Sequence, residues 1–189
     1  LHGQSHKVKR LELGYLLRTP ALKELREGES SESEIGGNTS VRNLLKGNPQ
    51  LGLNQLLTGE NAFGTLMERA CFPAVPSQGD PYPKEGEPYF NGGYNTRRYT
   101  AYDHPKVFGM QIEANFQGVR DSEENRKNFS KAFAESITTY LDFVESYMDW
   151  NKIQCPGFFP RGNNWPISRE ESSTIGFTEY RILWKLINQ

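Results

Sequence analysis

The amino-acid sequence predicts an α/β fold in which a mixed, largely parallel central sheet is flanked by helices. Two observations lead to this prediction. Short segments with β-capable apolar residues alternate along the chain with segments that carry helix start and stop signals. One long segment in the last third of the chain also repeats apolar residues every three or four positions, which is typical of an amphipathic helix packed on a sheet.

The composition indicates a loop-rich globular protein. The chain has 189 residues, 12% aromatic residues, 18 glycines and 11 prolines, which is enough for one domain with a real core. The formal net charge of -1 gives no support for nucleic acid or an anionic membrane as a partner. No apolar run approaches the roughly 18 residues that a membrane span needs.

The first elements are expected to be a strand end, a strand, a short helix and a loop. Leu1 reads as the last residue of a strand that begins upstream, and "VKRLELGYLL" predicts the next strand. Thr19-Pro20 matches a helix start, and Gly28 matches a helix end. The acidic, serine- and glycine-rich residues 27–40 predict an exposed loop.

Short helices and a long proline-rich loop are expected next. The helix-start signals are Ser40 before "VRNLLKG", Asn48-Pro49 in the segment that runs toward Leu57, and Asn61 before "AFGTLMERACF". Residues 73–94 contain too many prolines for regular structure beyond a short strand at Ala74-Val75. Long ordered loops of this kind are often functional.

The best strand candidate and the longest helix come last. Residues 106–116, "KVFGMQIEANF", predict a strand, and Ser122 with Asn125 resembles a helix-capping pair. The following helix should turn an apolar stripe toward the sheet, formed by Phe129, Phe133, Ile137, Tyr140, Val144 and Tyr147. We expect residues 1–150 to belong to one domain and residues 151–189 to form a C-terminal extension packed on it.

Several features favour a secreted protein. The chain does not begin with Met and carries two glycosylation sequons, at Asn38 and Asn128. The two cysteines, Cys71 and Cys155, are compatible with one disulfide or with two buried thiols, and an oxidising compartment favours the disulfide. Glycan is expected at Asn38 more than at Asn128, because Asn38 lies in the predicted exposed loop.

The N-terminal stretch "LHGQSH" is a candidate metal site. A histidine just beyond a strand end lies where open α/β sheets bind ligands, and histidine is the commonest metal-ligating side chain. Gly3 argues against a helix that would bring both histidines to one metal, so His2 is the expected ligand and His6 a weak second. The alternative is a pair of exposed histidines at a frayed terminus.

The stretch "NGGYNTRRY" is a candidate anion-binding turn. Gly92-Gly93 allows a tight turn, and an arginine behind it, Arg97 or Arg98, could clamp a carboxylate through a bidentate fork. The alternative is a surface loop with two solvated arginines. The lone His104 in "YDHP" is expected to have a structural role in a turn.

Glu113 in "MQIEANF" is a candidate general base or acid. A carboxylate among apolar strand residues is costly unless it is paired or used chemically. At the end of its strand Glu113 would face the same crevice as His2, and an apolar setting would suit it to proton transfer. The alternative is a strand-edge glutamate paired with an arginine.

These stretches, in this order, resemble the N-formylglutamate amidohydrolase-like family, which comprises zinc-dependent amidohydrolases related in fold to the zinc carboxypeptidases. The resemblance runs from Leu1 to about Tyr147, and each motif in it is short. It implies that His2 binds zinc, that Arg97 with Tyr94 nearby holds the α-carboxylate of the substrate, and that Glu113 activates water and passes its proton to the leaving amine.

The resemblance also implies that zinc ligands are missing from this chain. In the family the first ligands come from an upstream His-containing turn, and catalytic zinc generally takes three protein ligands. We therefore expect a zinc-exopeptidase, phosphorylase/hydrolase-like fold that is incomplete at the N-terminus, with the other ligands on a separate N-terminal chain or segment. The expected function is hydrolysis of a small N-acyl amino acid or peptide with a free carboxylate. The alternative is a non-catalytic secreted matrix, storage or recognition protein that retains the fold.

Overall fold

The chain folds around a small mixed sheet. A computed structural model describes residues 2–3 and 8–148, and within them the sheet has four strands in the order β1-β4-β2-β3. The strands are β1 (His2–Gly3), β2 (Leu11–Gly14), β3 (Ala74–Val75) and β4 (Gln111–Ala114). β1 pairs with β4 and β2 with β3 in parallel, whereas β2 and β4 are antiparallel. The predicted α/β class and mixed sheet are therefore confirmed, but the central strand pair is antiparallel.

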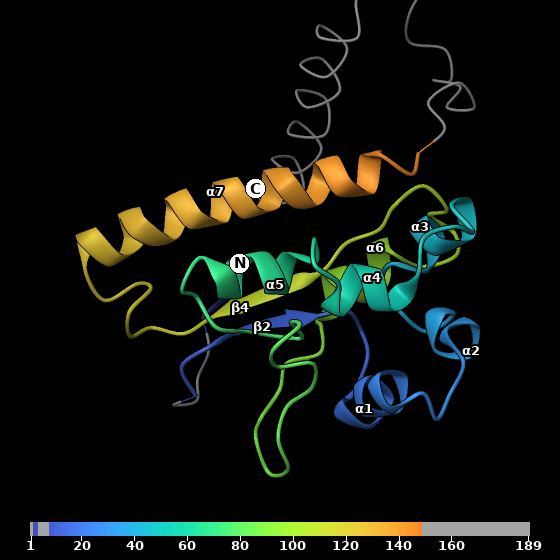
Figure 1. The fold of residues 1–189 in the computed structure, drawn as a ribbon, viewed down its shortest axis with the longest axis horizontal. Helices are drawn as coiled ribbons and strands as arrows, with labels where there is room; N and C mark the ends of the chain where they lie inside the picture. The colour runs from blue at the N-terminus through green and yellow to red at the C-terminus, as the bar shows by residue number, and fades with distance from the viewer. Residues whose placement is uncertain (1, 4–7, 149–189) are drawn as a thin grey trace, which may run out of the picture. The chain divides into compact units, whose positions relative to one another are not determined.

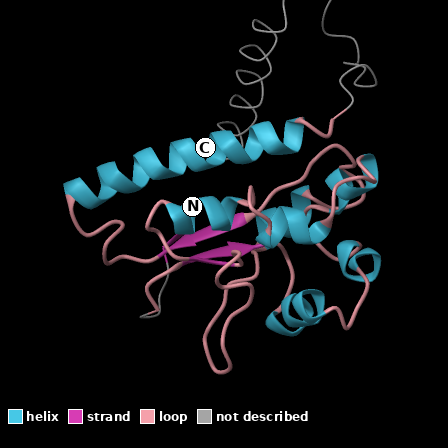
Figure 2. Cartoon of the chain, viewed as in Figure 1, coloured by secondary structure: helices cyan, strands magenta, loops and turns pink. Residues whose placement is uncertain are grey.

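Helices surround this sheet (Figures 1 and 2). They are α1 (Thr19–Glu27), α2 (Glu32–Gly36), α3 (Arg42–Gly47), α4 (Leu53–Thr58), α5 (Phe63–Arg69), α6 (Tyr94–Tyr99) and α7 (Glu123–Glu145). No helix in the described part of the chain combines the length and the apolar character needed to cross a membrane.

The ends of α1 and α7 follow the sequence signals. α1 begins at Thr19-Pro20 and ends at Gly28, whose φ of 73° is the left-handed conformation that glycine adopts without strain. α7 begins after Ser122, whose Oγ accepts a hydrogen bond from the backbone N–H of Asn125 at 3.0 Å. Both helix predictions are confirmed.

One face of the sheet is covered by α5 and α7, which lie above it in Figure 1. A Cβ on Gly64 of α5 would lie 2.9 Å from Cδ1 of Leu13, so α5 packs directly on β2. Phe63 of α5 contacts Phe133 and Tyr140 of α7, with ring centroids 5.4 and 6.3 Å apart. The predicted stripe of α7 is thus buried or half-buried, and its aromatic contacts outside α7 are with Phe63 of α5 and with Phe72, which follows α5.

The predicted loop over residues 27–40 is wrong in its centre, because α2 forms there. Ser31 Oγ accepts the N–H of Glu34 at 3.3 Å, and the Ser31 N–H is bonded to Glu34 Oε2 at 3.0 Å. This is a capping box, and it lets the helix bury Ile35. The Ser-x-x-Glu signal was present in the sequence but was outweighed by the polar composition.

α4 and α5 begin later than predicted. α4 starts at Leu53 rather than near Pro49, because the Leu53 N–H is capped by Oε2 of Glu32 from α2 at 2.5 Å. α5 starts after Ala62, which has no side-chain cap, rather than after Asn61. Helix starts that depend on a distant residue cannot be read from local sequence.

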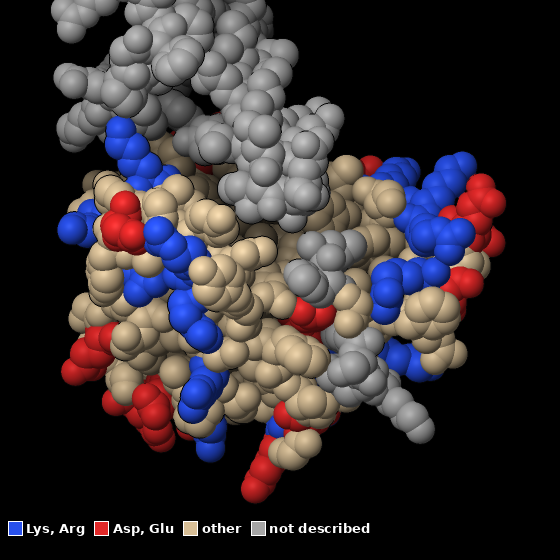
Figure 3. Space-filling model, turned by 180° about the vertical axis from the view of Figure 1, so that it is seen from behind, with Lys and Arg blue, Asp and Glu red and all other residues tan. Residues whose placement is uncertain are grey.

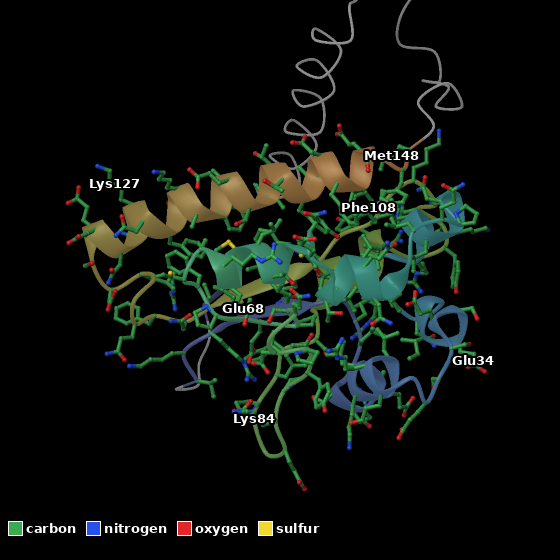
Figure 4. The ribbon with its side chains drawn as sticks, viewed as in Figure 1. Glu34, Glu68, Lys84, Phe108, Lys127 and Met148 are labelled. Carbon is green, nitrogen blue, oxygen red and sulfur yellow. The ribbon has the colours of Figure 1, made fainter. Side chains whose placement is uncertain are left out.

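The opposite face of the sheet is covered by the long loop between β3 and α6. Backbone N–H of Gly79, near the start of this loop, is bonded to Oε2 of Glu68 at 3.1 Å, and Lys84 projects at its far end (Figure 4). The last part of the loop, residues 87–93, returns across β2 and leads into α6. We call residues 87–93 the returning segment.

Candidate active site

The strand pairing aligns His2, Glu113 and Glu12 across neighbouring strands. His2 of β1 is the register partner of Glu113 on β4, and Glu113 is in turn the partner of Glu12 on β2. Adjacent strands lie about 4.8 Å apart, so the backbone brings these positions together. His2 lies within its strand rather than after it, which corrects the prediction. Its side chain, and all of His6, fall outside the described residues.

Glu113 is buried, with an exposed fraction of 5%, and is held in one orientation. Its Oε1 accepts a hydrogen bond from Nε2 of Gln111, which lies two residues earlier on the same face of β4. Within the described residues no group is bonded to Oε2. β4 lies between β1 and β2, so Glu113 is not on an edge strand, and among the described residues it forms no ion pair with an arginine, in contrast to the alternative interpretation.

Glu12 is a site residue that the sequence interpretation missed. Its exposed fraction is 0%, its Oε2 accepts the backbone N–H of Phe90 at 3.1 Å, and its Oε1 lies 3.7 Å from Nη2 of Arg10. The signal that could have found it is the one that singled out Glu113, a carboxylate between apolar residues of a strand.

Glycines bring the returning segment into contact with the strands. A Cβ on Gly14 of β2 would lie 2.5 Å from the backbone nitrogen of Gly92 and 2.6 Å from the carbonyl carbon of Asn91. Gly92 itself has a φ of 126°, which side chains rarely adopt. A Cβ on Gly93 would lie 2.6 Å from Oε1 of Gln111. The segment therefore crosses the face of the sheet that carries Glu12, Gln111 and Glu113.

Arg97 is the arginine of α6 that remains available to a ligand. Its backbone N–H is bonded to the carbonyl of Gly93 at 3.1 Å, so it lies one helical turn beyond the contact with Gln111. Arg97 is exposed, and among the described residues its side chain has no ion pair or hydrogen bond. Tyr94 at the start of α6 is 76% exposed.

Arg98 is engaged elsewhere. Its Nη1 lies 2.8 Å from Oδ2 of Asp103 and 2.8 Å from Nε2 of His104. The hydrogen bond from Arg98 lowers the pKa of Asp103. His104 also packs its ring near Tyr99, with centroids 6.0 Å apart. These contacts tie together the turn after α6, so they favour a structural role for Arg98 and His104.

Buried and half-buried charges lie beside Glu12, around Arg10. Nη1 of Arg10 forms a short ion pair with Glu87 and lies 3.6 Å from Asp80, both on the loop before α6. The hydrogen bond from Arg10 lowers the pKa of Glu87, whereas burial raises the pKa of Asp80. Over the face seen in Figure 3, charges of both signs are interspersed, so a ligand anion meets separate cations there rather than one basic surface.

An open pocket of about 350 Å³ borders the returning segment on its α1 side. It is lined by Arg18, Thr19, Pro20, Glu87, Tyr89 and Asn91. The sequence interpretation did not predict it.

The predicted zinc site is only partly within the described residues. Among these residues, no group of three His, Cys, Asp or Glu side chains is arranged to hold a metal. The position of His2 suits a zinc site chemically, since imidazole nitrogen is a common zinc ligand. The zinc prediction thus depends on side chains outside the described part.

The predicted disulfide and glycans remain predictions. Cys71 is a free, exposed cysteine, and Cys155 lies outside the described residues, as does the predicted extension over 151–189. Asn38 is exposed, but Ser40 of its sequon is buried, with its hydroxyl donating to the carbonyl of Gly109 at 2.6 Å. Asn128 is exposed on α7.

Comparison of the chain with protein-family models, with curated proteins and with solved structures found no match. The resemblance to the amidohydrolase-like family therefore rests on the sequence motifs alone.

Proposed function

We propose that this chain forms the C-terminal part of a secreted zinc-dependent amidohydrolase with the phosphorylase/hydrolase-like fold. It would hydrolyse the amide bond of a small N-acyl amino acid or peptide that has a free carboxylate. The observation that carries the proposal is the register of β1 and β4, which makes His2 the neighbour of Glu113 beneath a segment that leads to Arg97, an arginine without an ion pair among the described residues.

In this proposal Arg97 binds the carboxylate of the substrate. A guanidinium group matches a carboxylate bidentately, and Arg97 has no competing acid among the described residues. Gly93, the N-cap of α6, comes close to the side chain of Gln111, which is bonded to Glu113. Tyr94, which precedes Arg97 by one turn, offers an exposed ring to the rest of the substrate.

Glu113 acts as the general base and then as the general acid. Gln111 holds Oε1, so Oε2 is left to take a proton from water and return it to the leaving amine. Zinc, when bound, would polarise the amide carbonyl and make water easier to deprotonate. His2 would be one of the residues that hold the metal, and His6 is a weak second candidate.

The test is hydrolysis by the natural protein that contains this chain, supplied with zinc. N-formyl and N-acetyl amino acids serve as substrates, and the same compounds with an amidated carboxyl group serve as controls. Glu113→Gln should lower kcat by roughly 10²–10⁴-fold without loss of fold, which is the usual scale for a general acid or base.

The arginines provide a matched pair of variants for the same assay. Arg97→Lys should raise KM for carboxylates only, because an ammonium group cannot replace the planar fork. Arg98→Lys should leave KM unchanged, since Arg98 is paired with Asp103. If the wild-type protein folds and binds zinc but hydrolyses none of these compounds, the catalytic proposal is wrong, and a non-catalytic binding protein that retains the fold becomes the better interpretation.

A further inference from the structure

Glu12 is a fully buried carboxylate that the proposed chemistry does not use. It lies directly opposite Glu113 in the antiparallel ladder of β2 and β4. Two like charges in this position destabilise a sheet, and a buried carboxylate is costly unless it is well bonded. A residue that bears this cost at the centre of a candidate site requires an explanation.

The contacts of Glu12 point to the returning segment. Its Oε2 accepts the backbone N–H of Phe90 at 3.1 Å, and its Oε1 lies 3.7 Å from Arg10. Arg10 in turn is paired with Glu87 and donates to the carbonyl of Pro88 at 3.3 Å. Glu12 of β2 and Arg10, which lies just before the strand, thus hold three positions of the segment.

Further bonds fix the rest of the segment on β2 and on the residues that follow it. The Tyr89 hydroxyl donates to the carbonyl of Leu13 at 2.6 Å, and the Leu16 N–H donates to the carbonyl of Asn91 at 2.6 Å. The Phe90 side chain is 41% exposed, so apolar burial contributes little at this position. At Phe90 the attachment therefore depends on the polar contact with Glu12, whereas Tyr89 beside it also packs against the core.

The segment leads directly to the arginine that the proposed function uses. Phe90 precedes Gly93 by three residues, and Gly93 is the N-cap of α6, which carries Arg97 one turn later. Glu12 of β2 accepts the Phe90 N–H, and β2 is also paired with β4, the strand that contains Glu113. Glu12 is thus one of the contacts that connect the segment before Arg97 to the strand paired with that of Glu113.

We infer that Glu12 is a positioning residue. Its carboxylate ties the returning segment to the central strand and so sets the distance between the carboxylate-binding Arg97 and the proton-transferring Glu113. The part that concerns Arg97 rests on the proposed function, whereas the tie between Glu12 and the segment does not.

The first experiment measures hydrogen exchange of the amides in residues 87–97, in the natural protein that contains this chain. Glu12→Gln keeps the shape and an oxygen acceptor but loses the charge. Exchange should become about tenfold faster, because a charged acceptor makes a stronger hydrogen bond than a neutral one. Glu32→Gln is the matched control. Glu32, a residue of α2, also accepts a backbone N–H, that of Leu53, but it does not contact the returning segment. Unchanged exchange over 87–97 in Glu12→Gln overturns the inference, whatever the activity.

The second experiment measures binding of N-acetylglycine, a minimal carboxylate-bearing amide, by calorimetry. Glu12→Gln and Arg97→Ala should each weaken binding about tenfold, and the double variant should be no weaker than Arg97→Ala, because one residue acts through the other. Additive losses would show that Glu12 acts independently of Arg97 and would overturn the positioning role.

Kinetics separate this inference from the proposed function. If hydrolysis occurs, Glu12→Gln should raise KM and leave kcat within a few-fold; a loss in kcat alone would contradict a positioning role. If the wild-type protein does not bind N-acetylglycine, the proposed function and the positioning of Arg97 both fail, and the exchange result alone decides whether Glu12 holds the segment.

Discussion

Gly14→Ala tests the close contact between β2 and the returning segment. The added Cβ would lie 2.5 Å from the nitrogen of Gly92, 2.6 Å from the carbonyl carbon of Asn91 and 2.8 Å from the Gly92 Cα. Non-bonded heavy atoms normally approach to about 3.5 Å, so the segment would have to move by about 1 Å. All three atoms belong to backbone, which cannot move aside as a flexible side chain can.

The magnitude follows from the contacts that this movement disturbs. Overpacking in a buried site costs about 1–3 kcal/mol. The same shift strains the hydrogen bonds Leu16 N–H to Asn91 and Phe90 N–H to Glu12, each of which contributes about 0.5–1.5 kcal/mol. We therefore expect Gly14→Ala to lower the free energy of unfolding by about 2–4 kcal/mol and Tm by roughly 5–10 °C.

Urea unfolding followed by circular dichroism provides the assay, with Gly47→Ala as the control. Gly47 ends α3, and a Cβ there would meet nothing within 4 Å. That variant should be neutral or more stable by up to about 1 kcal/mol, because alanine favours the helix. If Gly14→Ala is as stable as Gly47→Ala and exchanges the amides of residues 90–93 no faster, the segment does not cross β2 as described.

Three further predictions concern single side chains. The pKa of Glu87 is lowered chiefly by its hydrogen bond from Arg10. The stability that ionised Glu87 provides is therefore present above its ordinary pKa of 4.5 and is lost as the pH falls through the lowered value. The Tm of Glu87→Gln should fall less than the Tm of the wild type as the pH is lowered, and an equal fall in both proteins would contradict this. Ser122→Ala should lower the free energy of unfolding by about 1 kcal/mol through loss of the α7 N-cap, whereas Ser130→Ala within the helix should change it little in the same urea titration. The Tyr15 hydroxyl is fully buried beside Tyr140, and burial raises its pKa, so Tyr15→Phe should change the free energy of unfolding by no more than about 1 kcal/mol in thermal unfolding; a larger loss would show that this hydroxyl is strongly hydrogen-bonded.

Elements governed by local signals could be predicted from the sequence. Pro20 and Gly28 mark both ends of α1, and Ser122 marks the start of α7, because caps and turns depend on residues within one turn of the helix end. The β-capable apolar residues likewise located β2 and β4, although each strand is shorter than the segment predicted for it. The capping box at Ser31 is a local signal as well, but the polar composition of residues 27–40 favours a loop, so α2 was not predicted.

Features that depend on distant pairing could not be predicted. The antiparallel pairing of β2 with β4 joins residues about 100 positions apart in the sequence and alone makes Glu12 the neighbour of Glu113. Likewise, the choice between Arg97 and Arg98 depends on which of them reaches Asp103 in the following turn. The motifs indicate which residues could take part in chemistry. The pairing of distant strands and side chains decides which of these residues lie side by side.

The central claim is that His2 and Glu113 belong to a zinc-dependent hydrolytic site, and zinc content tests it most directly. The natural protein that contains this chain would be purified without chelators, equilibrated with zinc, dialysed and analysed by elemental mass spectrometry beside its His2→Ala and Glu113→Gln variants. We predict about one zinc per chain for the wild type and for Glu113→Gln, since the latter residue moves protons, and a marked loss of zinc in His2→Ala. A wild-type protein without zinc, or a His2→Ala variant that retains all of it, would contradict the account.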